Sequence, residues 1–263
     1  MKKNTLSVAL LATLLGLAAC STKDITPAPN VTGTGTTTPT TPTTPAVATV
    51  TVNAPITTNT TWSASSKYLL KGYVYVRSGA TLTIEAGTVI FGDKDTKGAL
   101  IVEPGAMLMA IGTAAKPIVF TSNQPKGSRN YGDWGGLIIA GNAPVNSIVN
   151  GVQPTIEGGP TTKYGGTNAT DNSGVLQYVR LEFGGVAFSP NNEVNGLTLA
   201  GVGSSTVLDH IQVSYSGDDS FEWFGGTVNA KYLVSHRCFD DDFDTDNGFS
   251  GKIQFGVALR DPL

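Results

Sequence analysis

The sequence repeats itself at short intervals, and this repetition limits the folds open to the chain. Ser78–Leu82 matches Pro104–Leu108 at an offset of 26, and Tyr73–Val76 matches Ala99–Val102 at the same offset. Inside each repeat, short runs of β-branched and aromatic residues are separated by turns that contain glycine, which is typical of β-strands. Repeats of about 20 to 30 residues built from such strands indicate a solenoid, in which each repeat packs on its neighbours.

A second series of repeats follows further along the chain. Leu176–Leu181 aligns with Leu208–Val213 at an offset of 32, and Asn229–Val234 continues the series at an offset of 21. Gly135–Gly141 likewise resembles Asn195–Gly201, at an offset of 60. Unequal offsets imply insertions in the turns. We expect the longest insertion, residues 146–171, to form a loop.

Three short strands per repeat predict an all-β, parallel β-helix domain over residues 49–263. A β-sandwich and a β-propeller are the alternatives, but the turns recur every few residues rather than every ten, which favours the β-helix. The clearest predicted strands are Val74–Val76, Thr81–Ile84, Val89–Phe91, Leu100–Val102, Met107–Met109 and Ile118–Phe120. Little follows the last predicted strand, Lys252–Leu259, so we expect the solenoid to be truncated at its C-terminal end.

The N-terminal segment predicts export and lipid anchoring. Residues 1–19 read as a signal peptide, with Lys2 and Lys3 before an apolar stretch that is too short to span a bilayer comfortably. The stretch closes with Leu17-Ala18-Ala19-Cys20, which resembles the bacterial lipobox. We therefore expect cleavage before Cys20 and acylation of its thiol, for instance with palmitate. An ordinary secretory signal with a chance cysteine is the alternative.

Residues 20–48 contain the lipidated cysteine and a linker of unusual composition. Residues 21–45 hold 11 Thr and five Pro and almost no large apolar side chains. Such a segment cannot bury enough surface to offset its ordering entropy, so we expect a disordered tether. Ser21 follows the cysteine, which favours sorting to the outer membrane in bacteria that have two membranes. The predicted location is the cell envelope, outside the cytoplasm.

The charge balance excludes one class of partner. The whole chain has 17 basic and 20 acidic residues, and the signal peptide carries two of the basic ones and none of the acidic ones. The mature chain is therefore acidic, by about five charges. Nucleic-acid binding needs clustered Lys and Arg, so we expect no nucleic-acid partner. The membrane is expected to be contacted through the lipid at Cys20.

Part of the chain resembles a known family. The resemblance is carried by Gly196–Gly203, by Gly217–Gly226 (GDDSFEWFGG) and by Asp240–Gly248 (DDDFDTDNG), and it extends over most of residues 60–263. These segments resemble a largely uncharacterised family of bacterial cell-surface lipoproteins that fold as right-handed parallel β-helices. The resemblance implies the handedness of the fold and its location, and it implies no chemistry.

Two acidic turns are the strongest candidates for a ligand site. They stand at an offset of 22, about one coil, so their carboxylates should stack and raise one another's pKa unless a cation lies between them. Carboxylate and carbonyl oxygens are the ligands that calcium prefers. The candidate calcium ligands are Asp218, Asp219, Asp240, Asp241, Asp242, Asp244 and Asp246. The alternative is that these acids are solvated turn residues. Asp242, Asp244 and Asp246 have the spacing that opens an EF-hand calcium loop, but the match then fails. Asn247 and Ile253 stand where that loop requires Gly and Glu, so we expect no EF-hand.

The candidate catalytic residues form no defined constellation. Many β-helix proteins are polysaccharide lyases or hydrolases, and the repeat alignment places four cations near the acidic turns: Arg180, Lys231, Arg237 and Lys252. With so many aspartates, however, some suitable carboxylate pairs would arise by chance. Tyr131, Trp134 and Trp223 could stack on sugar rings or fill the interior. Cys238 is expected to be a buried, unreactive side chain.

These observations favour a lipid-anchored, non-enzymatic surface module that binds a glycan, an envelope polymer or a protein, with calcium as the one candidate cofactor. A polysaccharide lyase or glycoside hydrolase is the alternative. A purely structural envelope component is a third class.

Overall fold

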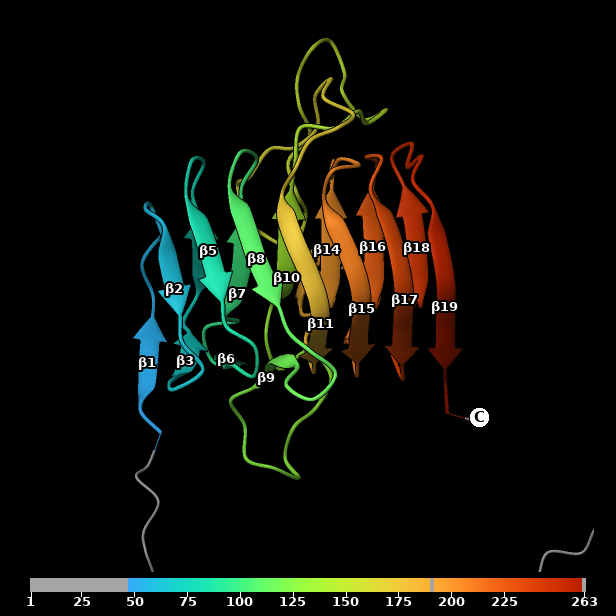
Figure 1. Cartoon of the computed structure of the whole chain (residues 1–263). Coiled ribbons are helices and arrows are strands. Elements are labelled where there is room, and N and C mark those ends of the chain that lie inside the picture. Colours follow the sequence, from blue (N-terminus) through green and yellow to red (C-terminus); the bar gives the residue numbers. More distant parts are fainter. Residues whose placement is uncertain (1–46, 190–191, 262–263) are drawn as a thin grey trace, which may run out of the picture. The chain divides into compact units, whose positions relative to one another are not determined.

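The computed structural model describes residues 47–189 and 192–261, which form a right-handed parallel β-helix (Figure 1). The predicted signal peptide, Cys20 and nearly all of the linker lie outside the described residues. In the part of the chain that the structure describes, no helix is long and apolar enough to cross a membrane.

Two parallel sheets run along the solenoid. The larger sheet has eleven strands: β1 (Thr49–Val52), β2 (Thr60–Trp62), β3 (Lys67–Leu70), β5 (Thr81–Ile84), β6 (Val89–Gly92), β8 (Met107–Ile111), β9 (Ile118–Ser122), β11 (Gly174–Glu182), β15 (Val207–Ser214), β17 (Asn229–His236) and β19 (Ile253–Leu259). The second sheet has six: β4 (Tyr73–Val76), β7 (Ala99–Val102), β10 (Gly136–Ala140), β14 (Leu197–Ala200), β16 (Phe221–Phe224) and β18 (Phe243–Asp246). An antiparallel pair, β12 (Ala187–Ser189) and β13 (Asn192–Glu193), lies outside both.

The strand registers confirm most of the repeats found in the sequence. Thr81 pairs with Met107, at the predicted offset of 26. Leu137 pairs with Leu197, at the predicted offset of 60. The turns repeat too, since Gly79 and Gly105 both adopt positive φ angles, of 84° and 81°, that suit glycine.

One predicted offset is wrong by a single residue. Leu208 pairs with Ala230, so β15 and β17 are related by an offset of 22 instead of 21. A shift of one residue in a strand exchanges its inward and outward side chains. The observed register places His210 beside Tyr232, whose rings stack with centroids 4.5 Å apart.

The inward side chains form one continuous apolar core. In β16, Phe221 and Trp223 point into this core and are fully buried. Phe221 stacks on Phe243 of the next coil, with ring centroids 5.4 Å apart. Equivalent positions of successive coils therefore supply most of one another's apolar contacts, as expected for a solenoid.

The four central strands of the six-stranded sheet, β7, β10, β14 and β16, are buried on their outer face as well. Ile101, Ile138 and Phe224 point outward and belong to a second apolar cluster. Ile156 and Tyr164, from the long insertion, are nearly fully buried in the same cluster. The insertion is a loop, as predicted, but part of it packs against this sheet as a cover.

The coils change shape between β9 and β11. In the earlier coil, β8 and β9 are separate strands joined by residues 112–117. In the next coil, one long strand replaces both, because Gln177 of β11 pairs with Ile111 of β8 and Val179 pairs with Ile118 of β9. A single residue, Tyr178, therefore takes the place of the whole connection.

The residue at this bend has a left-handed backbone conformation in four successive coils. The residues are Tyr178, His210, Tyr232 and Phe255, with φ angles of 50°, 52°, 55° and 63°. This conformation is uncommon for residues other than glycine. Their rings stack in a continuous ladder, with centroids 4.4, 4.5 and 4.9 Å apart. We call these four residues the aromatic ladder, and its stacking offsets part of the backbone strain.

The last described strand, β19, pairs with β17 along one edge. Phe255, Val257 and Leu259 of this strand are each about half exposed. Residues 260–261, the last described, form no further element.

Substitution of His210 tests the link between the bend and the ladder. His210→Val places a β-branched residue in a left-handed conformation, at a cost of about 1–2 kcal/mol, and removes two ring contacts of about 0.5–1.5 kcal/mol each. We expect its free energy of unfolding to fall by about 2–5 kcal/mol in denaturant titration. His210→Phe should stay close to wild type, as should Val207→Thr at an exposed site of the same strand. Equal stability of the Val and Phe variants would contradict this account.

Candidate functional site

The two acidic turns stack, as the sequence predicts. They precede β16 and β18, whose register pairs Phe221 with Phe243, at the predicted offset of 22. Carboxylate oxygens of Asp218, Asp219 and Asp240 lie within 4.8 Å of one another. The backbone N–H of Asp241 donates to Asp219 Oδ1 at 2.8 Å, which holds one turn on the other.

A second group of carboxylates continues onto the sheet. Carboxylate oxygens of Asp219, Glu222 and Asp244 also lie within 4.8 Å of one another. Glu222 and Asp244 are register partners in β16 and β18, and both alternate with the inward residues, so they lie on the outer face that the loops cover. The Asn195 side-chain amide donates to Glu222 Oε2, and Asn195 Oδ1 accepts the Asp219 backbone N–H.

The covering segments add two more acids, Glu157 from the long insertion and Glu193 from β13. Burial raises the pKa of Glu222 to about 9, and the negative charges of Glu157, Asp219 and Asp244 act in the same direction. Burial and the charge of Glu193 raise the pKa of Glu157 to about 7. No Lys, Arg or His of the described residues forms an ion pair with these carboxylates.

Burial and neighbouring charge also raise the pKa values of the two turn aspartates. Burial raises the pKa of Asp219 to about 7, against the hydrogen bond from Asp241. Burial and the charge of Glu193 raise the pKa of Asp218 to about 6. We call Glu157, Glu193, Asp218, Asp219, Glu222, Asp240 and Asp244 the acid cluster.

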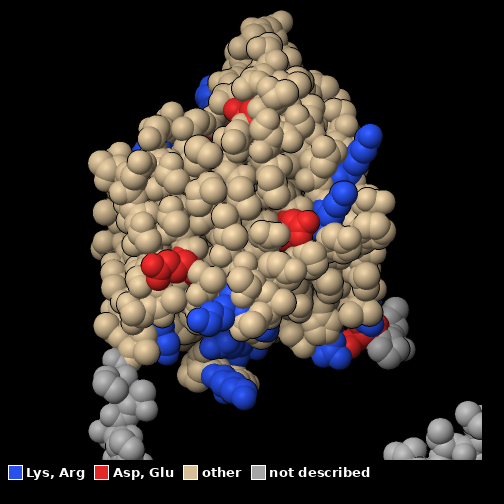
Figure 2. Space-filling view, in the orientation of Figure 1, with Lys and Arg blue, Asp and Glu red and all other residues tan. Residues whose placement is uncertain are grey.

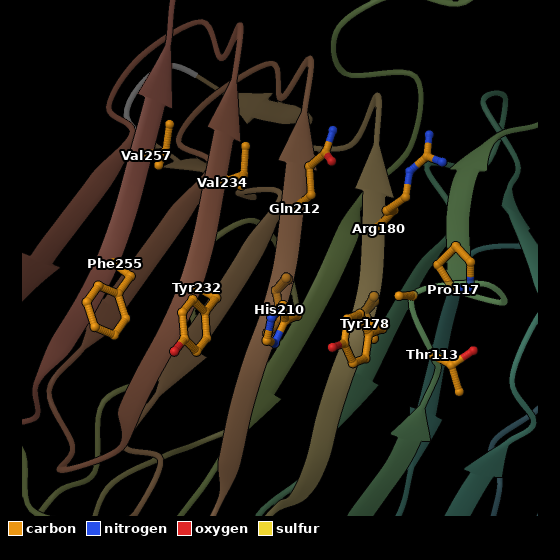
Figure 3. A pocket seen from close by; sticks show the side chains of 13 residues that line it. Thr113, Pro117, Tyr178, Arg180, His210, Gln212, Tyr232, Val234, Phe255 and Val257 are labelled. Carbon is orange, nitrogen blue, oxygen red and sulfur yellow. The ribbon is translucent and has the colours of Figure 1, made fainter. Parts of the chain in front are cut away.

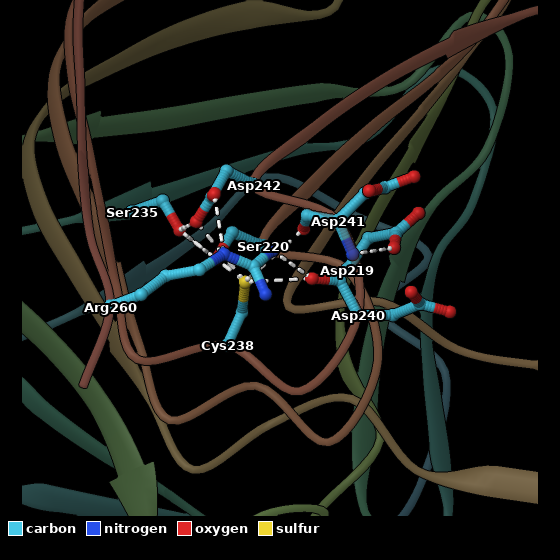
Figure 4. A network of polar contacts seen from close by, with 8 residues as sticks. All are labelled: Asp219, Ser220, Ser235, Cys238, Asp240, Asp241, Asp242 and Arg260. Atoms are coloured by element: carbon cyan, nitrogen blue, oxygen red, sulfur yellow. Dashed lines mark hydrogen bonds and ion pairs between the residues drawn. The ribbon is translucent and has the colours of Figure 1, made fainter. Parts of the chain in front are cut away.

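Three of the seven candidate calcium ligands lie outside the cluster, and Figure 4 shows one of them, Asp242, in a separate network of polar contacts. Asp242 turns instead toward Ser235, whose hydroxyl donates to Asp242 Oδ1 at 2.5 Å, and toward Arg260, whose Nε lies 2.8 Å from Asp242 Oδ2. Burial acts to raise the pKa of Asp242, but the hydrogen bonds from Ser235 and Arg260 lower it overall. Asp241 and Asp246 are exposed.

Cys238 lies within the network around Asp242. Its side chain is buried, as predicted, and its Sγ lies 3.3 Å from the carbonyl oxygens of Asp240 and Asp241. Burial raises the pKa of the thiol. A neutral thiol among carbonyl oxygens is a poor nucleophile, so this cysteine fastens the turn that precedes β18.

The four predicted cations also lie away from the acid cluster. Arg180 pairs with Glu182, and Arg237 pairs with Asp261. Lys231 and Lys252 are exposed and form no ion pair with the described residues. None of these four cations therefore forms an ion pair with the acids of the two turns.

The acid cluster offers the type of oxygen ligands that a hard cation takes. Asp219, Glu222 and Asp244 offer oxygens close enough together to share one ion, and calcium is bound by such oxygens in flexible geometry. Calcium binding stays a prediction, with Glu222 and Glu157 added to the candidate residues. Glu222 could have been found from its outward position in a strand beside Asp244. Nothing in the repeats marks Glu157, which lies much earlier in the chain, in an insertion.

A groove follows the aromatic ladder on a different face of the domain (Figure 3). It encloses about 490 Å³. Thr113, Ala114 and Pro117 form a wall at one end, because their connection protrudes where the next coil has only Tyr178. Beside the ladder runs a second row of outward side chains, two positions further along the same strands: Arg180, Gln212, Val234 and Val257.

The groove combines ring edges with a few polar groups. The ladder rings cover one another's faces, so the groove presents mainly their edges, the Tyr hydroxyls and the imidazole. Tyr232 and Phe255 are 44% and 53% exposed. Arg180 is paired with Glu182, and His210 Nδ1 is paired with Asp209. None of the residues that line the groove carries a carboxylate.

The aromatic residues singled out in the sequence behave differently. Trp134 and Trp223 are fully buried, so they fill the interior and cannot stack on a ligand. Tyr131 is 38% exposed and packs edge-on against Tyr215, with ring centroids 5.6 Å apart. The ladder was missed because its residues recur once per coil in strands whose register was misjudged by one residue.

The fold is that of a parallel β-helix domain with a laterally open groove. The family described as "Pectate-lyase like beta helix domain" matches residues 54–261. The chain therefore belongs to this family. Comparison with curated proteins and with solved structures gave no match.

The acid cluster predicts that stability falls as pH rises. Burial raises the pKa of Glu222 from its ordinary value of 4.5 to about 9, so the folded state holds the proton more tightly than the unfolded state. This contribution is fully present below about pH 4.5 and is lost as pH rises through about 9. The melting temperature should therefore decrease between pH 5 and pH 9.

Glu222→Gln mimics the protonated acid, so its melting temperature should exceed that of wild type at pH 8 and vary less with pH. Glu103→Gln, which removes an ion pair with Arg77 in another coil, serves as the control and should keep the wild-type pH profile. A wild-type profile in Glu222→Gln would contradict the assignment.

Calcium should raise the melting temperature if an ion binds among these carboxylates. Mass action gives about 2.7 kcal/mol of stabilisation at one hundred times the dissociation constant, and magnesium should do less because it requires stricter octahedral geometry. Asp219→Asn combined with Asp244→Asn should abolish the shift, whereas Asp246→Asn, outside the cluster, should retain it. If calorimetry shows no change of the melting temperature at millimolar calcium, the calcium prediction is wrong and the carboxylates are neutralised by protonation.

Proposed function

We propose that this chain is a lipid-anchored, non-enzymatic module of the bacterial cell envelope that binds an extended glycan along the aromatic ladder. The observation that carries the proposal is the groove of about 490 Å³ above Tyr178, His210, Tyr232 and Phe255. The ladder repeats once per coil, so the groove offers a series of similar contacts along the solenoid axis. A linear polymer of similar units is the ligand that matches such a series.

The chemistry of the groove suits a sugar polymer. Sugars present hydroxyls that need donors and acceptors, and C–H surfaces that pack on apolar groups. Tyr178, Arg180 and Gln212 supply the polar groups, while Val234 and Val257 supply apolar contacts. Binding sites of this kind are mostly apolar, with a few convergent polar groups that fix orientation.

Removal of exposed ladder rings should weaken glycan binding. Tyr232→Asn removes a ring but keeps a residue that tolerates the left-handed conformation, and Gln212→Ala removes a polar contact. We expect the double variant to bind about tenfold more weakly, equivalent to about 1.4 kcal/mol. Affinity electrophoresis in gels that contain dextran, xylan, alginate or dextran sulfate measures the effect.

The control for this experiment is Phe239→Asn, which removes a 76% exposed ring outside the groove. It should bind like wild type. If the groove variant binds the glycan as tightly as wild type does, the glycan binds elsewhere on the domain.

The anchor is proposed from the sequence alone. Leu17-Ala18-Ala19-Cys20 resembles a lipobox, and a Thr- and Pro-rich segment follows it. Wild type should incorporate an alkynyl fatty acid in cells and fractionate with the outer membrane. Cys20→Ala should incorporate none. A labelled Cys20→Ala protein, or an unlabelled wild type in the medium, would refute the anchor.

A polysaccharide lyase or glycoside hydrolase is the second candidate, and the family description is what favours it. Against it stands the separation of chemical groups. Arg180 lines the groove and is already paired with Glu182, whereas the acid cluster lies beneath the covering segments. Incubation with alginate or polygalacturonate, followed by ultraviolet absorbance of new double bonds, tests the lyase directly.

A further inference from the structure

A second hollow lies at the next corner of the same coils. It encloses about 570 Å³ and is lined by Lys126, Gly127, Arg129, Asn130, Tyr131, Phe183 and Tyr215. Phe183 and Tyr215 occupy equivalent corners after β11 and β15, both with left-handed backbones, and their rings stack 5.0 Å apart. The connection between β9 and β10 protrudes beside them and forms the opposite wall.

The hollow is cationic. Neither Lys126 nor Arg129 forms an ion pair with the described residues, and no acid lines the hollow. The nearby acids are already paired, Asp133 with Lys94 at 2.9 Å, Asp261 with Arg237 at 2.7 Å, and Glu182, which accepts a hydrogen bond from Thr121, with Arg180. Lys and Arg side chains gather on this end of the domain, over the connections beside β9 (Figure 2).

Arg129 is held in place before any ligand arrives. Its Nε donates to the Gln124 carbonyl oxygen at 3.1 Å, and one terminal nitrogen donates to Thr121 Oγ1 at 3.0 Å. The second terminal nitrogen has no partner among the described residues. A guanidinium fixed in this way keeps donors free for an acid group and loses little entropy when it binds one.

The aromatic wall adds a surface for a ring. Tyr131 lies edge-on to Tyr215, with an interplanar angle of 73°, so the two walls of the hollow meet at an aromatic corner. A ligand that satisfies both features carries a negative group beside a compact body with C–H surface. An acidic sugar has this combination, whereas a neutral sugar leaves the two cations unused.

We propose that this hollow binds an acidic sugar unit, with its carboxylate or sulfate between Lys126 and Arg129 and its ring against Tyr131 and Tyr215. The site deepens the proposed function and rests on it, since the sugar would belong to a glycan held by the same domain. The backbone runs from Tyr178 to Phe183 along β11, which spans about 17 Å in an extended strand. A single polymer chain that bears acid groups can span this distance and so reach both hollows.

The test compares charged and neutral polymers on the full chain. The probes are alginate, which carries carboxylates, dextran sulfate, which carries sulfates, and neutral dextran. Wild type should bind at least one charged polymer more tightly than dextran, and this preference should fade as NaCl is raised from about 50 to about 500 mM, as expected for screened ion pairs. The charged polymer that binds more tightly shows whether the hollow prefers a carboxylate or a sulfate.

Lys126→Gln combined with Arg129→Gln should weaken binding of that polymer about tenfold, equivalent to about 1.4 kcal/mol, and leave dextran binding unchanged. Because Arg129 also holds its own loop, Lys126→Gln alone serves as a second variant, and Lys126→Arg should restore binding. Lys163→Gln removes an exposed lysine elsewhere, with the same change in net charge, and should bind like wild type.

Equal loss in Lys126→Gln and Lys163→Gln would reduce the effect to net charge and overturn the site. Unchanged binding of the charged polymer in both Lys126 variants would also overturn it, while leaving glycan binding at the ladder intact. Failure of wild type to bind any of the three polymers would instead refute the proposed function itself.

Discussion

The parallel hydrogen bonding between successive coils is the constraint on which the rest of this structure depends. Each coil pairs with the next in a fixed register, so equivalent side chains lie directly above one another at the spacing of neighbouring strands. The backbone register thereby decides which side chains of neighbouring coils stack on one another. Whether a given column of residues stabilises the fold is then decided by the chemistry of the side chains alone.

Two columns show opposite outcomes of this constraint. Where the repeated residue is aromatic, as in the ladder from Tyr178 to Phe255, stacking supports a bend that would otherwise be strained. Where the stacked residues are acidic, as at Glu222 and its register partner Asp244, burial and the neighbouring negative charges raise the pKa of Glu222. The covering segments strengthen this effect by excluding water, so ionisation destabilises the acid cluster in a way that has no counterpart in the ladder.

The sequence predicts the fold well because each coil of a solenoid corresponds to a short local repeat. The offsets of 26 and 60 come directly from matched strands and turns. The register of β17 was misjudged because Leu208–Val213 and Ala230–Ser235 share few apolar positions, and because the aromatic residue at the bend interrupts the alternation of inward and outward side chains.

The sites were less predictable than the fold, for a related reason. The stacking of the acidic turns follows from their offset, but Glu157 reaches the cluster through an insertion that no repeat describes. Both hollows likewise arise between a repeated corner and a connection that occurs only once. The repeated corner residues of each hollow can be predicted from the repeats, whereas the connection that forms its wall depends on tertiary packing.

The replacement of residues 112–117 by the single residue Tyr178 has a further consequence for how such a domain can change. The perimeter of one coil differs from that of its neighbour, yet the strands on both sides of the corner remain paired. Length can therefore vary at a corner without disturbing register, and the closure entropy of a longer connection grows only slowly with its length. The walls of the hollows can therefore be remodelled one coil at a time in the corner connections, while the strands that hold the solenoid together stay unchanged.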